Sequence, residues 1–199
     1  MEKQTVNLSE AKIMGGIGSI LTLLAIVPAV GIFLAIVGLV LVLLAVKSAS
    51  DAFGDRKIFN EMLYAVILGI AGIVIAGLSI AAFAFKALGL SSLPFSAPAA
   101  AAVHWSDAGF WGVIGAVLLG LAAVWVCVLV SSVFVYRSYG ALGRKVGVGL
   151  FGTAALIFLI GAVLTIFLVG FALIFVAEIL FVVAFFSINS QVPTQTSIQ

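Results

Sequence analysis

The run IFLVGFALIFVAEILFVVAFF, residues 166–186, is long enough to cross a lipid bilayer and contains one charged residue, Glu178. A helix of about 20 predominantly apolar residues spans the hydrocarbon core of a membrane. The whole chain has the same character, because 65% of its 199 residues are hydrophobic and only 8% are charged. A soluble domain carries about 25% charged residues. The composition therefore predicts an integral membrane protein.

Six apolar segments, separated by charged or turn residues, predict an all-α membrane bundle of about six transmembrane helices. The segments are residues 9–27, 30–48, 59–86, 108–136, 147–166 and 169–188. Pro28 and Gly31 interrupt the first pair and Gly170 the last pair, so we expect two tight hairpins, one at each end of the chain. Residues 1–188 are expected to form a single transmembrane domain, and the polar residues 189–199 a disordered tail.

Lysine and arginine fall almost entirely on one side of the membrane when six helices are threaded through it. The residues on that side are Lys3, Lys12, Lys47, Arg56, Lys57, Arg137, Arg144 and Lys145. Lys86 alone is left on the other side. Because Lys and Arg are retained in the cytoplasm, we expect a multi-pass protein of the cytoplasmic membrane with both termini cytoplasmic. Tyr64, Tyr136 and Tyr139 are expected at the inner membrane boundary.

Small residues recur on one stripe of each predicted helix, with a period close to 3.5. In lipid, small residues let helix backbones approach closely, and this contact replaces the hydrophobic driving force that is missing there. Glycine and alanine are also abundant in any transmembrane segment, so chance stripes remain the alternative. The residues expected to pack helices are Gly15, Gly18, Gly31, Gly38, Gly69, Gly72, Gly112, Gly120, Gly147, Gly161 and Ala177.

Glu178 is the candidate intramembrane acid. An ionised acid at the middle of a membrane helix costs a few kcal/mol, and no basic residue is expected at the same depth, so we expect it to be protonated. Two interpretations stay open. Glu178 is either the proton- or cation-exchanging group of a transport path, with hydroxyls from Ser19, Thr22, Ser79 or Thr153, or a neutral acid that hydrogen-bonds a neighbouring helix or a second protomer. A transport route usually shows more than one buried polar group, which favours the structural interpretation.

No pattern in the chain points to catalysis or to a cofactor. The sequence GVGLFG, residues 147–152, matches G-x-G-x-x-G, but it follows a basic turn and opens a membrane helix, with no strand before it. His104 and Cys127 are isolated, whereas a metal site needs several ligands. We expect no catalytic, cofactor-binding or metal-binding residues, no enzymatic activity and no nucleic-acid partner.

The first part of the chain resembles a known family. The residues that carry the resemblance are Leu8–Lys12, Gly15–Leu21, Pro28, Gly31, Val37–Leu39, Ala45–Lys47, Ser50–Asp51 and Ile58–Phe59. They are similar to a family of small polytopic membrane proteins, mostly archaeal, whose function is unknown. The resemblance is strongest over the first 75 residues, and it implies a prokaryotic membrane and no established activity.

Two functions follow from these observations. We expect a structural or accessory membrane protein that associates with itself or joins a larger membrane complex, in contact with the lipid bilayer. The alternative is a small transporter or channel for protons, cations or a small solute that uses Glu178 as its intramembrane acid. The two differ in whether Glu178 lies on a solvated path or in a packed contact.

Overall fold

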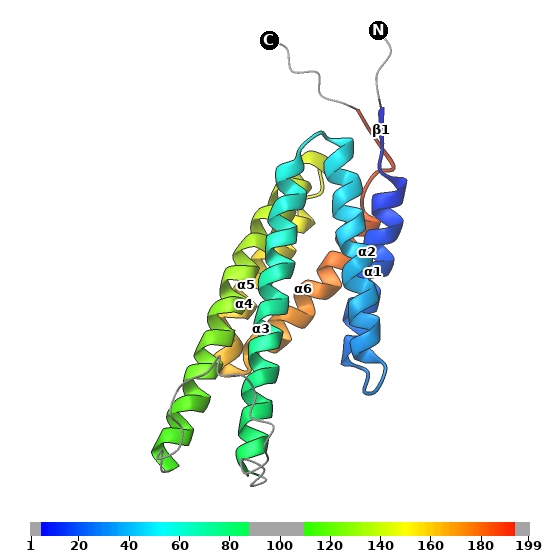
Figure 1. Ribbon diagram of the computed structural model, residues 1–199. Helices are drawn as coiled ribbons and strands as arrows, with labels where there is room; N and C mark the ends of the chain where they lie inside the picture. The colour runs from blue at the N-terminus through cyan, green and yellow to red at the C-terminus, as the bar shows by residue number, and fades with distance from the viewer. Residues whose placement is uncertain (1–4, 88–109, 194–199) are drawn as a thin grey trace. The chain divides into compact units, whose positions relative to one another are not determined.

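The computed structural model of the chain describes residues 5–87 and 110–193 (Figure 1). Six long helices run through these residues, and each is long and apolar enough to cross a membrane. They are α1 (Ser9–Leu23), α2 (Gly31–Ala52), α3 (Arg56–Ala87), α4 (Phe110–Val146), α5 (Leu150–Leu164) and α6 (Val169–Phe186). Two 3-10 turns, η1 (Leu24–Ile26) and η3 (Thr165–Phe167), follow α1 and α5. The predicted all-α membrane bundle of six helices is confirmed.

The chain divides into two compact units, where the sequence predicts one domain. Among the described residues, 5–67 and 129–193 form the first unit, which holds α1, α2, α5, α6, the start of α3 and the end of α4. Residues 68–128 form the second unit, from the remainder of α3 and α4.

In the first unit, α1 and α2 form the predicted hairpin and touch backbone to backbone (Figure 1). A Cβ atom at Gly18 would lie 2.8 Å from the carbonyl oxygen of Gly38, and one at Gly38 would lie 2.6 Å from the carbonyl oxygen of Gly18. Real Cβ atoms do not come so close to a backbone oxygen, so both positions require glycine. Close approach of this kind supplies the dispersion contacts that hold helices together in lipid.

The second hairpin, between α5 and α6, is also held by close backbone contact at two glycines. A Cβ atom at Gly161 would lie 3.0 Å from the carbonyl oxygen of Gly170, and one at Gly170 would overlap the carbonyl oxygen of Gly161. The turn itself is made by Leu168, which has a φ of 58°. In the first hairpin the corresponding residue is Ala29, with a φ of 70°. Both turns therefore place a non-glycine residue in the left-handed region, at a cost of about 1 kcal/mol each.

The charged ends of α1, α2, α3 and α4 lie together in the first unit, and we call this region the charged end. Here α2 and α4 run further than predicted, α4 by a further ten residues to Val146. Arg144 and Lys145 therefore lie in the last turn of α4, where the sequence places them in a loop. Basic side chains at this position interact favourably with the carbonyl end of the helix dipole.

Two short strands extend the charged end. The strand β1 (Thr5–Asn7) pairs antiparallel with β2 (Gln191–Pro193), with Val6 opposite Val192. The amide of Leu8 also donates to the carbonyl of Ser190. Residues 191–193 are thus ordered by pairing with the other end of the chain, which corrects the expectation of a tail disordered from residue 189.

The second unit contains a helix pair with looser small-residue contacts. A Cβ atom at Gly72 would lie 3.2 Å from the Cβ atom of Cys127, and one at Gly120 would lie 3.1 Å from the hydroxyl of Ser79. These distances are tight but involve side chains that can shift. The α3 and α4 backbones here are therefore close without being locked together.

Candidate functional site

Glu178 lies midway along α6, next to the fully buried Ala177. Its carboxyl is near enough to the hydroxyl of Tyr139, on α4, for the two groups to interact electrostatically. Tyr139 was expected at the membrane boundary, but only 4% of it is exposed. The sequence could not show this, because a tyrosine near a helix end fits an interfacial position equally well. The structure therefore places a second proton-bearing group beside the intramembrane acid.

Four aromatic rings lie together at this place. The ring of Tyr139 stacks 5.7 Å from Phe151 of α5 and lies 4.4 Å from Phe181 of α6, while Phe151 meets Phe185 edge to face at 4.9 Å. Such ring pairs contribute about 0.5–1.5 kcal/mol each beyond their buried area. Phe181 and Phe185 follow Glu178 by one and two turns along α6, in the direction of the charged end. The four rings therefore pack together between α4, α5 and α6, and Phe181 and Phe185 lie between Glu178 and that end along α6.

Three of the four hydroxyls proposed to assist Glu178 have partners on their own helices, and the fourth, that of Ser19, is buried in α1. Thr22 donates to the carbonyl of Gly18 at 3.0 Å, Ser79 to that of Ile75 at 2.8 Å, and Thr153 to that of Gly149 at 3.5 Å. Thr153 is also exposed. This back-bonding to the preceding turn is how hydroxyls are commonly satisfied in apolar helices. None of the three bonds connects one helix to another.

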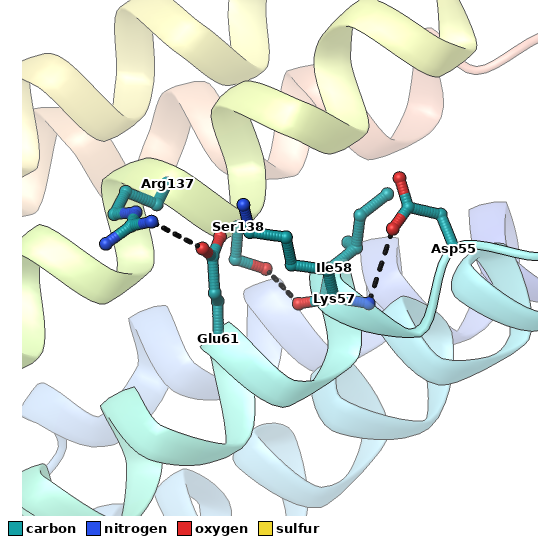
Figure 2. Close-up of polar contacts among 6 residues, drawn as sticks. All are labelled: Asp55, Lys57, Ile58, Glu61, Arg137 and Ser138. Carbon is teal, nitrogen blue, oxygen red and sulfur yellow. Dashed lines mark hydrogen bonds and ion pairs between the residues drawn. The ribbon is translucent and has the colours of Figure 1, made fainter.

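A polar contact between α3 and α4 lies at the charged end (Figure 2). Arg137 pairs with Glu61 at 3.2 Å, and Ser138 donates to the carbonyl of Ile58 at 2.8 Å. Glu61 has 9% of its side chain exposed and Arg137 has 52%. Two turns deeper, Ser131 donates to the carbonyl of Ala65 at 2.8 Å. From the sequence, these charged residues are interpreted only as signals of membrane topology. A local pattern cannot show that residues so far apart in the chain are in contact.

The start of α3 is fixed by its own side chains. The carboxylate of Asp55 accepts a hydrogen bond from the Lys57 amide at 3.3 Å, as expected of a residue just before a helix. Across the turn from α2, the Ser50 hydroxyl donates a hydrogen bond to the backbone carbonyl of Asp55 at 2.7 Å. Asp55 also pairs with Lys145 at 3.5 Å. The beginning of α3 is therefore tied both to α2 and to the end of α4.

A cleft of about 380 Å³ opens beside this polar contact. Its lining residues are Asp55, Lys57, Ile58, Glu61, Tyr136, Arg137, Ala141 and Arg144. A second cleft, of about 340 Å³, lies between α1 and α2 and is lined by Glu10, Met14, Leu44, Lys47, Ser48 and Asp51. Both clefts are at the charged end, and neither is lined by Glu178. Within the described ranges, no three His, Cys, Asp or Glu side chains form a group that could hold a metal ion.

The remaining residues predicted to pack helices occupy different environments. Gly15 of α1 faces the ring of Phe185, where a Cβ atom would overlap the ring. Gly69 is half-buried in α3. Gly112 lies in α4, in a stretch where the structure does not describe the packing of side chains. Gly31 closes the first hairpin, because a Cβ atom there would overlap the carbonyl of Ala25.

Gly147 differs from these residues. It is exposed, lies in the turn between α4 and α5 with a φ of +72°, and has no described atom within 4 Å of the place a Cβ atom would occupy. A glycine in the left-handed region just after a helix is a common way to end it. Gly147 is therefore a turn residue, and the expectation that it packs α5 against a neighbour is corrected. The first glycine of the G-x-G-x-x-G match is therefore a turn residue, and the other two, Gly149 and Gly152, lie at the start of α5.

The six apolar helices, together with the charges at one end of the first unit, define the class of protein. It is a small multi-pass membrane protein. Comparison with known proteins is consistent with this class. The chain matches a family described as a protein of unknown function, DUF996, over residues 34–179. An uncharacterised protein of the archaeon Methanocaldococcus jannaschii is 33% identical over 190 residues, which cover 96% of this chain and 98% of the relative. No solved structure matches.

The chain belongs to the DUF996 family. The resemblance to a family of archaeal membrane proteins of unknown function is therefore confirmed. It also extends much further than the first 75 residues, since the match to the relative runs nearly from end to end.

Proposed function

We propose that this protein is a structural or accessory component of the cytoplasmic membrane, with both termini on the cytoplasmic side and no catalytic activity. In this proposal it associates with itself or with a larger membrane complex. The charged end of the first unit is the cytoplasmic end, because the basic residues gather there.

The observation that carries the proposal is the packing between Glu178 and the charged end. A transport path from the cytoplasm to Glu178 along α6 would pass the rings of Tyr139, Phe151, Phe181 and Phe185, and these residues are buried against one another. Protein interiors are as closely packed as organic crystals, so rings in mutual contact leave no room for a column of water. A closed interior favours a packing role for Glu178.

Association is supported by small residues that the described helices leave uncovered. Gly77 on α3 and Gly115 on α4 are exposed, and among the described residues no atom lies within 4 Å of a Cβ placed at either. Glycine costs helix stability of roughly 1 kcal/mol relative to alanine. Close approach by another transmembrane helix at such positions would offset that cost.

Reconstitution into sealed proteoliposomes tests the proposal. Proton and cation flux is measured for the wild type and for Glu178→Gln, and the oligomer size of both is determined in the same preparations. We expect no flux from either protein and an altered oligomer size or lower thermal stability for the variant. Flux in the wild type that disappears in a correctly assembled variant would overturn the proposal.

A transporter remains the second candidate, and one observation favours it. The half-buried Glu178 interacts electrostatically with the buried Tyr139, and intramembrane acids commonly serve proton relays. Substitution Tyr139→Phe separates the two functions, because it removes the hydroxyl and keeps the ring contacts. In a transporter this variant loses flux while its stability is unchanged, whereas a structural protein shows no flux before or after the change.

A further inference from the structure

The cleft between α3 and α4 has unbalanced charge. Three cations line it, Lys57, Arg137 and Arg144, with two carboxylates, Asp55 and Glu61. Both carboxylates already have partners, since Glu61 pairs with Arg137 and Asp55 pairs with Lys145, which does not line the cleft. Lys57 and Arg144 are thus left without a carboxylate partner in the part of the chain that the structure describes. The cleft is suited to an anion.

Arg137 and Arg144 both lie at the wall of the cleft. The buried carboxylate of Glu61 engages one terminal nitrogen of Arg137, and half of the Arg137 side chain remains exposed (Figure 2). The guanidinium of Arg144 lies over Gly140, with its nitrogen 3.7 Å from the place a Cβ atom would occupy. Arginine presents several N–H donors in a fixed plane, a geometry that suits phosphate oxygens. The ion pair that positions Arg137 lowers the entropy lost when its guanidinium binds an anion.

The polar cleft borders an apolar surface. Tyr64 follows Glu61 by one turn along α3, more than half of it is exposed, and its ring lies 5.8 Å from that of Phe134 on α4. Tyr136 lines the cleft itself. Val130 and Val133 are exposed on α4 further from the charged end. An anion bound in the cleft would therefore lie directly above a surface suited to hydrocarbon chains.

We propose that this cleft binds the phosphate headgroup of an anionic membrane lipid, with Lys57, Arg137 and Arg144 contacting the phosphate and the acyl chains lying over Tyr64 and Phe134. A soluble phosphate would satisfy the three cations equally well. The adjoining apolar surface is what favours a lipid. This proposal is independent of Glu178 and holds for either function considered above.

The test measures binding of two short-chain lipids to the purified full chain in detergent, by thermal shift and by native mass spectrometry. One lipid, dioctanoyl phosphatidylglycerol, is anionic, and the other, dioctanoyl phosphatidylcholine, is zwitterionic. Each basic residue near an anionic lipid contributes about fivefold in affinity, so Lys57→Gln with Arg144→Gln should weaken phosphatidylglycerol binding roughly 30-fold. Arg137 is left in place, because its removal would leave Glu61 buried and unpaired.

The matched control is the double variant Lys12→Gln with Arg56→Gln, which removes the same charge from the charged end without touching the cleft. We expect it to lower affinity less than about threefold, through long-range charge alone. Equal losses in the two double variants would overturn the proposal, and so would protection by inorganic phosphate at the concentrations at which phosphatidylglycerol acts. If the cleft variant fails to fold, Lys57→Gln alone carries the test, with an expected loss of about fivefold.

Discussion

Two helix contacts in the first unit are built in opposite ways. The glycine contact, between Gly18 of α1 and Gly38 of α2, places backbone against backbone, and the Thr22 hydroxyl beside it bonds within its own helix to the Gly18 carbonyl. The polar contact, between α3 and α4, uses the Glu61–Arg137 ion pair and the Ser138 bond to the Ile58 carbonyl.

The difference reflects where each contact lies. The polar contact is at the charged end, where Arg137 is half-exposed and its remaining N–H donors can reach water or headgroups. The glycine contact lies within the apolar segments, where an unsatisfied polar group costs several kcal/mol. Ser131 marks the transition, because it is deeper than Ser138 and is satisfied by a single bond to the Ala65 carbonyl. Depth in the membrane thus selects the kind of contact.

The largest effect is expected at the glycine contact. Gly38→Ala places a methyl group 2.6 Å from the Gly18 carbonyl oxygen, so the helices must separate. We expect a loss of about 3 kcal/mol in the free energy of unfolding, measured by thermal or denaturant unfolding in detergent. The control is Gly152→Ala, at an open position of α5, which should be neutral or stabilising by up to about 1 kcal/mol. Equal loss in both variants would contradict a specific backbone contact.

At the polar contact, Arg137→Ala should cost about 2 kcal/mol, because it leaves the buried Glu61 carboxylate without its partner. The double variant Arg137→Ala with Glu61→Leu should recover most of this loss, since the buried charge is removed as well. Unfolding of the single and double variants in the same detergent measures the difference. A double variant as unstable as the single one would show that Arg137 acts through packing and not through Glu61.

Ser138→Ala is expected to cost about 1 kcal/mol, the usual net contribution of one hydrogen bond. The Ser138 hydroxyl is fully buried and bonds to a carbonyl of another helix. The comparison variant is Ser187→Ala, whose exposed hydroxyl bonds within its own helix and whose loss should change stability by less than about 0.5 kcal/mol. If Ser138→Ala is as neutral as Ser187→Ala, the polar contact depends on its ion pair alone.

The smallest effect is expected for Lys145→Gln, which removes the ion pair to Asp55. Both side chains are at least one-third exposed and their charged atoms are 3.5 Å apart, so screening by solvent limits the loss to about 0.5 kcal/mol. High salt should abolish even this difference while leaving the Arg137→Ala effect largely intact. A salt-insensitive loss larger than that of Arg137→Ala would reverse the expected order of the two ion pairs.

The amino-acid sequence by itself determined the membrane class, the six helices, the two hairpins and the concentration of charge at one end. These properties depend on local composition, because hydrophobic length and turn residues act on neighbouring positions. Helix ends were less well predicted. The last ten residues of α4 are polar enough to resemble a loop, yet they stay helical because Tyr139 and Leu142 are buried against other helices.

The tertiary structure alone decided which residues meet. Gly31 and Gly170 look like turn residues in the sequence, but Ala29 and Leu168 take the left-handed conformations, while the glycines make room for carbonyl oxygens. Ser138 and Ile58 are 80 positions apart, and β1 and β2 come from opposite ends of the chain. Periodicity shows which face of a helix is apolar or small, but it carries no information about the partner of that face. The burial of Tyr139 beside Glu178 and the formation of the basic cleft both depend on such partners.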